Sequence, residues 1–119
     1  MGLDGLIIKK KWLNRILSGE KILEIRGSKT SKVDSSIFLL ESGSSLIRGK
    51  CRIKQVIPIT KEFWESNMDK HCVPISYEEL LKIYKKPYAW ELTDIEEFNE
   101  QHHYNHPKGA VIWVKNINI

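Results

Sequence analysis

The sequence predicts an α+β fold, a small, partly closed β-barrel with helices covering its openings. Short apolar runs separated by turn-forming residues recur along the chain, and each has the length of a strand. Few segments space their apolar residues as a helix does. With 119 residues, of which 41% are apolar and 29% charged, the chain is expected to form one globular domain over residues 1–119.

The N-terminal part alternates between predicted strands and one helix. The run Leu6-Ile7-Ile8 predicts a buried strand within residues 5–9. Residues 10–18 form a predicted helix, which the left-handed conformation tolerated by Gly19 would end. Its apolar residues at helical spacing are Trp12, Leu13, Ile16 and Leu17. Residues 21–26 follow as a second strand, and the polar residues 27–36 are predicted to form a mobile loop.

The longest strand is predicted over residues 46–59, after a strand at 37–40 and a turn of small residues at 41–45. Its alternation places Cys51, Ile53 and Ile57 on one face. The opposite face carries four cations, Arg48, Lys50, Arg52 and Lys54. Such a stripe is either a solvated outer face or a track for phosphates.

The C-terminal half begins with helices and ends with strands. Thr60 is suited to cap a short helix. The segment Ser76-Tyr77-Glu78-Glu79 has the pattern of a capping box for a helix through Tyr84. Strands are predicted over residues 88–92 and 110–114, with a polar, acidic loop at 94–106 between them.

Positive charge is concentrated in the N-terminal half. Residues 1–54 carry 12 Lys/Arg against 5 Asp/Glu, whereas residues 55–119 carry 7 against 10. An uneven distribution of this kind favours a partner that carries phosphates. We therefore expect RNA or single-stranded nucleic acid, or a modified nucleoside, as the partner.

Several classes are disfavoured by the sequence. No run approaches 18 apolar residues, so no membrane span is expected. The N-terminus lacks the pattern of a secretory signal, which predicts a cytoplasmic protein, or a nuclear one in a eukaryote. Cys51 and Cys72 show no paired spacing and are expected to be free thiols. The sequence leaves the oligomeric state open.

Metal and cofactor chemistry is also not favoured. His102, His103 and His106 lie close together, but no CxxC or HExxH frame accompanies them, and surface histidines are the simpler interpretation. His71 and Cys72 are adjacent in sequence, which does not orient their side chains toward each other. We expect no metal and no cofactor.

Residues 18–26 concentrate the polar chemistry of the chain. Lys21, Glu24 and Arg26 lie within six residues, and strand alternation puts Glu24 and Arg26 on one face. They could form an ordinary surface ion pair or grip a polar ligand together. Trp12 follows three lysines at 9–11, a combination typical of proteins that bind single-stranded nucleic acid.

These segments resemble the ASCH domain family. The likeness rests on Lys10-Lys11-Trp12, on residues 16–26 with the pattern Gly-x-Lys-x-x-Glu-x-Arg, and on later blocks at 39–43, 70–72, 88–90 and 106–113. One departure is Lys11, which stands where many relatives have proline. The resemblance implies a PUA-like β-barrel with a cleft between barrel and helices, and a role in binding RNA or modified nucleic acid.

The resemblance also implies the site residues. Lys21, Glu24 and Arg26 would line the cleft, with Ser42, His71 and Trp90 near it, and Trp12 or Trp90 would stack on a base. The expected binding set is Lys10, Trp12, Lys21, Glu24, Arg26, Ser42, His71 and Trp90.

Enzymatic alternatives stay open. Some ASCH-like proteins are bacterial amidohydrolases that remove the acetyl group from acetylcytidine. They resemble this chain at Lys21 but have a threonine where it has Glu24, and we expect Glu24 to favour the charged ammonium of Lys21. A metal-independent ribonuclease would use His71 with Lys21 or Glu24. A transcription coregulator-type interaction module is the third alternative.

Overall fold

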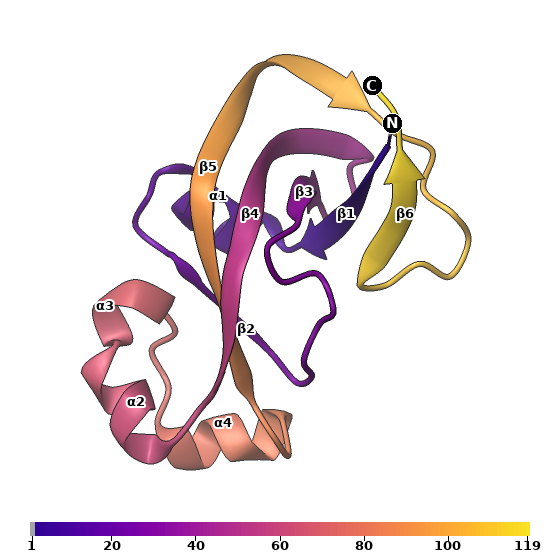
Figure 1. Cartoon of the computed structure of the whole chain (residues 1–119). Helices are drawn as coiled ribbons and strands as arrows, with labels where there is room; N and C mark the ends of the chain where they lie inside the picture. Colours follow the sequence, from indigo (N-terminus) through magenta and orange to yellow (C-terminus); the bar gives the residue numbers. More distant parts are fainter. Residues whose placement is uncertain (1) are drawn as a thin grey trace.

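The computed structural model describes residues 2–119 and combines a six-stranded sheet with four helices (Figure 1). The strands are β1 (Leu3–Ile8), β2 (Leu23–Arg26), β3 (Ser36–Glu41), β4 (Leu46–Pro58), β5 (Tyr88–His103) and β6 (Trp113–Ile117). The helices are α1 (Lys10–Leu17), α2 (Lys61–Ser66), α3 (Met68–His71) and α4 (Tyr77–Ile83). The predicted α+β class is confirmed. Across residues 2–119 no helix has the length and apolar character needed to cross a bilayer.

The sheet is open, so the predicted barrel is wrong. Its strand order is β2-β5-β4-β3-β1-β6, with β1 parallel to β3 and the remaining neighbours antiparallel. Closure would require hydrogen bonds between the edge strands β2 and β6. Both strands are short, and each pairs along one side, β2 with β5 and β6 with β1.

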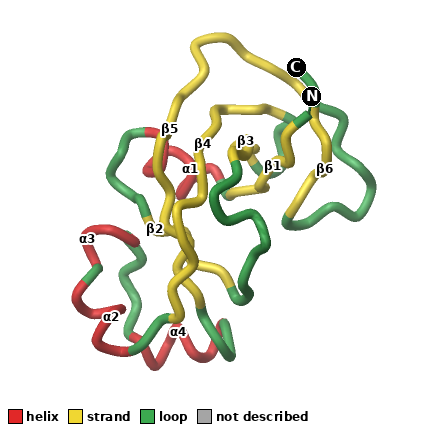
Figure 2. The backbone as a smooth tube through the Cα atoms, in the orientation of Figure 1, coloured by secondary structure: helices red, strands yellow, loops and turns green. Residues whose placement is uncertain are grey.

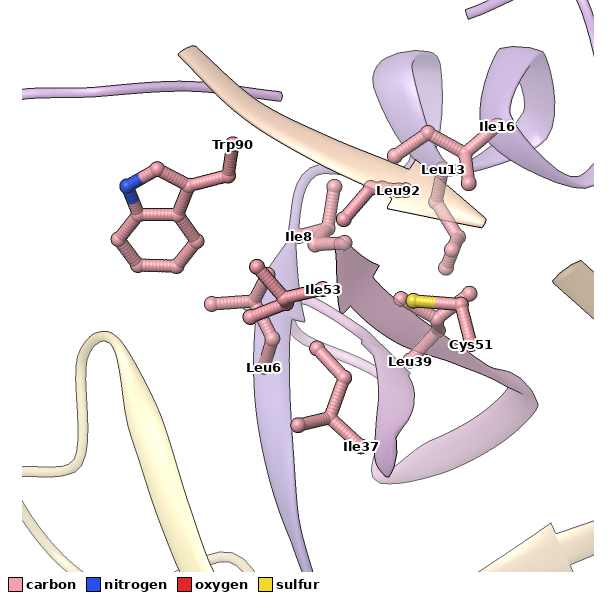
Figure 3. Packing of buried hydrophobic residues seen from close by; sticks show 10 residues of the cluster. All are labelled: Leu6, Ile8, Leu13, Ile16, Ile37, Leu39, Cys51, Ile53, Trp90 and Leu92. Carbon is pink, nitrogen blue, oxygen red and sulfur yellow. The ribbon is translucent and has the colours of Figure 1, made fainter. Parts of the chain in front are cut away.

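The core lies between α1 and the sheet. Helix α1 buries Leu13 and Ile16 against the strands, and Figure 3 shows these side chains among the aliphatic residues of the sheet. The ten buried residues of this cluster are Leu6, Ile8, Leu13, Ile16, Ile37, Leu39, Cys51, Ile53, Trp90 and Leu92. Burial raises the pKa of the Cys51 thiol to about 12, so it packs as a small apolar group.

Helices α2, α3 and α4 gather at one end of β4 and β5, as Figure 2 shows. Both predicted caps are present. Thr60 Oγ1 accepts from the Phe63 amide at 3.1 Å, and Ser76 and Glu79 form the reciprocal capping box of α4. Helix α3 ends at Cys72, whose backbone is left-handed (φ 63°).

Strand β5 is much longer than predicted. It continues to His103, through most of the polar segment at 94–106 that was expected to be a loop, because residues 96–103 pair with β4 between Lys50 and Leu46. Three register irregularities and the positive φ of Asp94 (53°) break its alternation. The last strand is shifted as well: β6 begins at Trp113, and Val111 and Ile112 are exposed.

Three of the four cations of β4 have a carboxylate within 4 Å. Arg48 Nη1 pairs with Glu41 at 2.6 Å, and Arg52 reaches one carboxylate in the 27–36 loop and one on β5. Lys54 Nζ lies 3.8 Å from Glu91, and Lys50 faces Glu96 across the ladder. This pairing favours the solvated outer face over a phosphate track.

Candidate ligand-binding cleft

A cleft of about 430 Å³ lies beside the start of α1. One part of its lining is polar or aromatic: Lys9, Trp12, Lys21, Glu24, Arg26 and Ser42. The remainder is apolar, and most of it comes from α4 and from the segments that precede α4 and β6. These apolar residues are Ile7, Ile25, Val73, Ile75, Leu80, Ile83, Tyr84 and Val111. The cleft is thus suited to a ligand with one polar edge and one apolar face.

Lys21 lies at the base of this cleft and is 1% exposed. Its Nζ donates to the carbonyl oxygen of His71 at 2.6 Å, lies 3.8 Å from Glu24 Oε1, and sits 5.0 Å from the centre of the Trp12 ring. Among the described residues this side chain therefore has one close hydrogen-bond acceptor, one carboxylate and one aromatic face. An ammonium has three donors, so donor capacity remains.

Glu24 and Arg26 form a two-point ion pair on one face of β2, as strand alternation predicts. Glu24 Oε2 accepts from Arg26 Nε at 3.0 Å and from Nη2 at 2.7 Å, and the same Nη2 donates to the carbonyl of Ile7 at 3.0 Å. Glu24 is 5% exposed, so this pair is largely removed from water. It is therefore not the ordinary surface ion pair considered from the sequence.

The pKa of Lys21 is lowered from its ordinary value. Burial is the largest cause because it disfavours the charged ammonium, and the neighbouring Glu24 offsets only part of the effect. We expected Glu24 to favour the ammonium, and it does act in that direction. Burial outweighs it, which brings the neutral amine closer to physiological pH.

His71 lies behind the cleft, not on its surface. Its ring is fully buried and stacks on Trp64, with centroids 3.6 Å apart and planes 9° apart. Nδ1 accepts from the amide of Val73 at 3.0 Å, so Nε2 carries the proton and donates to the carbonyl of Trp64 at 3.0 Å. Burial lowers the pKa of His71. The ring is therefore not part of the cleft lining, and the backbone carbonyl of His71 instead accepts from Lys21.

Trp90 is also not available to stack on a base. It is 1% exposed, its indole stacks on Trp113 with centroids 5.9 Å apart, and its Nε1 donates to the carbonyl of Ser28 at 3.0 Å. Figure 3 shows this ring at the edge of the cluster of buried aliphatic side chains. Trp12, by contrast, is half-buried and lines the cleft, which leaves it as the candidate for stacking.

Two further predicted residues occupy different places. Ser42 is exposed and lines the cleft, while its amide donates to the carbonyl of Ile8. Lys10 points to a second hollow of about 470 Å³ that it shares with Asn14, Glu41 and Arg48. Of the eight predicted residues, the cleft brings together Trp12, Lys21, Glu24, Arg26 and Ser42.

The sequence did not single out the apolar lining or Lys9. Lys9 belongs to the lysine run before Trp12, and its place directly after a predicted buried strand was the available signal. Tyr84 and Val111 come from segments far from residues 18–26, and no local pattern links them. Tyr84 packs so closely on the backbone that a Cβ at Gly27 would lie 2.6 Å from its ring.

A metal centre finds no support in the described part of the chain. Within residues 2–119, no three His, Cys, Asp or Glu side chains gather closely enough to hold an ion. His106 bonds to the Tyr104 hydroxyl and to the carbonyl of Ala110, and His102 lies against the Phe98 ring.

Solved structures of ASCH proteins share this fold. The ASCH protein from Zymomonas mobilis matches with a TM-score of 0.62 and 14% identity over 79% of this chain and 68% of that chain. One of its mutant forms matches with a TM-score of 0.63 and 14% identity, over 79% of this chain and 70% of that chain. Another mutant form matches with a TM-score of 0.69 and 12% identity, over 93% of this chain and 85% of that chain. A search of curated protein sequences finds no significant match.

The fold and the cleft define a small α+β domain with a polar site between the start of α1, strand β2 and helix α4. The ASCH domain family model matches residues 6–102, which contain most of the sheet and the polar wall of the cleft. The chain belongs to the ASCH domain family.

Proposed function

We propose that this ASCH domain binds RNA by taking one nucleobase, normal or modified, into the cleft. The observation that carries the proposal is the convergence of Lys21, Glu24 and Arg26 on one cleft beside the Trp12 ring. Arg26 and Lys21 supply donors for carbonyl or phosphate oxygens, and Glu24 supplies an acceptor for an amino group.

The division of the lining supports a nucleobase over a wholly polar ligand. A base has hydrogen-bonding groups along its edge and an apolar π-face, which matches a lining that combines polar groups with apolar side chains. Within the described residues, Glu24 Oε1 accepts no hydrogen bond, and Arg26 Nη1 donates none. These two atoms are therefore free to meet the edge of a base.

Fluorescence anisotropy with a labelled single-stranded RNA tests the proposal. Lys21→Met and Trp12→Leu should each weaken binding by about tenfold, the typical value of one base-stacking or charge-assisted contact. Arg52→Gln removes a cation from β4 and serves as the matched control, with affinity close to wild type. Equal affinity in all four proteins would contradict the proposal and would favour an interaction module in which the cleft has no part.

A hydrolase acting on a modified nucleoside is the second candidate, and the lowered pKa of Lys21 favours it. A buried amine next to a carboxylate can accept a proton or relay a nucleophile when an acyl amide is cleaved. Incubation of the pure protein with acetylcytidine should then release acetate in the wild type and not in Glu24→Gln. Absence of turnover in the wild type would exclude this substrate.

The ribonuclease version of the hydrolase is not proposed. It needs an acid–base group near the scissile phosphate, and His71 was the candidate for that role. Both ring nitrogens of His71 are engaged, and its ring is buried.

A further inference from the structure

We infer that the ligand is a single-stranded polynucleotide whose phosphates, on both sides of the bound base, contact two lysine clusters at separate ends of the cleft. The inference rests on the function proposed above and adds which lysines contact the phosphates of the RNA strand on either side of the bound base. We call Lys9 and Lys11 the α1 cluster, and Lys29, Lys85 and Lys86 the α4 cluster.

The α1 cluster borders the polar end of the cleft. Lys9 is exposed and contributes to the lining. Lys11 is exposed, and its Nζ lies 4.7 Å from the centre of the Trp12 ring. Because Trp12 lines the cleft, a base stacked there would bring its backbone phosphate near these two ammonium groups.

The α4 cluster borders the apolar end. Lys85 and Lys86 are exposed and directly follow Tyr84, which lines the cleft. The contact of Tyr84 with Gly27 brings the 27–36 loop to this end, and Lys29 Nζ lies 5.9 Å from the centre of the Tyr88 ring. Lys29 thus belongs to the loop that Tyr84 contacts, and Lys85 and Lys86 directly follow Tyr84 in the sequence.

These five lysines have no described counter-charge, a property that they share with Lys10, Lys50, Lys70, Lys82, Lys108 and Lys115 and that separates them from the paired cations. Arg15, Lys32, Arg48, Arg52, Lys54 and Lys61 each have a carboxylate within 4 Å, whereas no described carboxylate lies that close to either cluster. Neighbouring cations without counter-charges repel one another and leave a positive potential over the surface. Phosphates would neutralise it, and a neutral nucleoside would not.

The separation and the depth of the site point to a strand. The α1 cluster adjoins the start of α1 and the α4 cluster includes the residues that follow α4, two helices that Figure 1 places apart, and a strand with several phosphates can reach both. The groups at the base of the cleft are deeply buried, with Lys21 1% and Glu24 5% exposed. A base must leave a duplex to reach them, which selects a single strand.

The test measures binding of a fluorescein-labelled RNA of about ten nucleotides between about 50 and about 200 mM salt. The variants are Lys9→Gln with Lys11→Gln for the α1 cluster, and Lys29→Gln, Lys85→Gln and Lys86→Gln together for the α4 cluster. Each should reduce the slope of log affinity against log salt by about 0.7 for every phosphate that the variant no longer neutralises. Lys54→Gln with Lys115→Gln removes charge away from the cleft and should leave the slope unchanged.

Different failures have different meanings. If uridine or its monophosphate binds as tightly as the strand, the inference of a polynucleotide ligand is wrong, while the proposal that the cleft binds a base stands. The same holds if an RNA duplex binds as tightly as the single strand. If only one cluster changes the slope, the ligand has phosphate on one side and the two-sided path is wrong. If neither strand nor nucleoside binds the folded wild type, both this inference and the proposed function fail.

Discussion

The cleft and the outer face of β4 both place cations beside carboxylates, but they differ in burial. Lys21 and the Glu24 side chain are 1% and 6% exposed, whereas Arg52 and its partners Asp34 and Asp94 are 37%, 76% and 71% exposed. Exposed pairs are screened by water and contribute little, while a buried charge that loses its partner is costly. The same residue types therefore build a functional candidate in one place and a solvated face in the other.

The two regions should differ most in the free energy of unfolding that is lost when one carboxylate is removed from each. Glu24→Gln leaves Arg26 and Lys21 without their shared counter-charge in a buried setting, and we expect a loss of about 3 kcal/mol in the free energy of unfolding. Glu91→Gln, its counterpart beside Lys54, should cost less than about 1 kcal/mol. Urea unfolding of both variants measures the difference, and similar losses would remove the distinction between the regions.

The second largest effect on stability should come from the hydrogen bonds of the His71 ring, which lies behind the cleft. His71→Leu leaves the Trp64 carbonyl and the Val73 amide without their partner, and we expect a loss of about 2 kcal/mol. His71→Gln can restore one donor and one acceptor, so it should recover much of that loss in thermal unfolding. Equal losses in the two variants would show that ring packing on Trp64, and not hydrogen bonding, sets the stability here.

His71 also predicts a response to acid. Its pKa is lowered in the folded protein, so the unfolded chain binds the proton first as the pH falls below the ordinary value of 6.5. The stabilisation is complete above that pH and is lost progressively toward the lower folded pKa. Across this pH range, the free energy of unfolding should fall more steeply with decreasing pH in the wild type than in His71→Gln. Parallel pH dependences in the two proteins would contradict a lowered pKa of His71.

A second pH effect belongs to Lys21. Because burial lowers its pKa, the unfolded chain holds the proton more tightly than the fold does, and stability should rise as the pH increases toward 10.5. The difference in unfolding free energy between wild type and Lys21→Met should therefore shift in favour of the wild type as the pH rises toward 10.5. Lys54→Met, on the exposed face, should show no such shift.

The smallest effect is expected on the exposed face itself. Arg52→Ala removes contacts to two exposed carboxylates, which should change stability by less than about 1 kcal/mol. At about 1 M salt the change should fall further because exposed charges are screened. A salt-independent loss measured by urea unfolding would indicate that Arg52 packs as well as pairs.

Local patterns in the sequence predicted much of the fold. Helix α1, the capping box at Ser76 and the common face of Glu24 and Arg26 all depend on residues close in the chain, so spacing alone indicated them. The length of β5 was missed because its polar residues face the cations of β4, which lie far away in the sequence. The open sheet was missed because closure depends on how the edge strands meet.

The residues of the site were predicted only in part, because the sequence indicates local motifs but not contacts between distant segments. The motif identified Lys21, Glu24 and Arg26, but whether a tryptophan or histidine is exposed depends on partners elsewhere in the chain. Trp113 covers Trp90, and Trp64 covers His71. Both rings were assigned to the ligand because a sequence motif does not distinguish the lining of a cleft from the core behind it.

The tryptophan indoles provide the most direct test of the central claim that a base enters this cleft. In a ¹H–¹⁵N spectrum recorded during titration with single-stranded RNA, the Trp12 indole and the Arg26 Nε–H should shift, while the indole of Trp113, which stacks on the buried Trp90 ring and is not part of the cleft lining, stays in place. Saturable shifts confined to cleft groups are the predicted result. An unchanged Trp12 signal, with shifts along β4 and β5, would contradict the account.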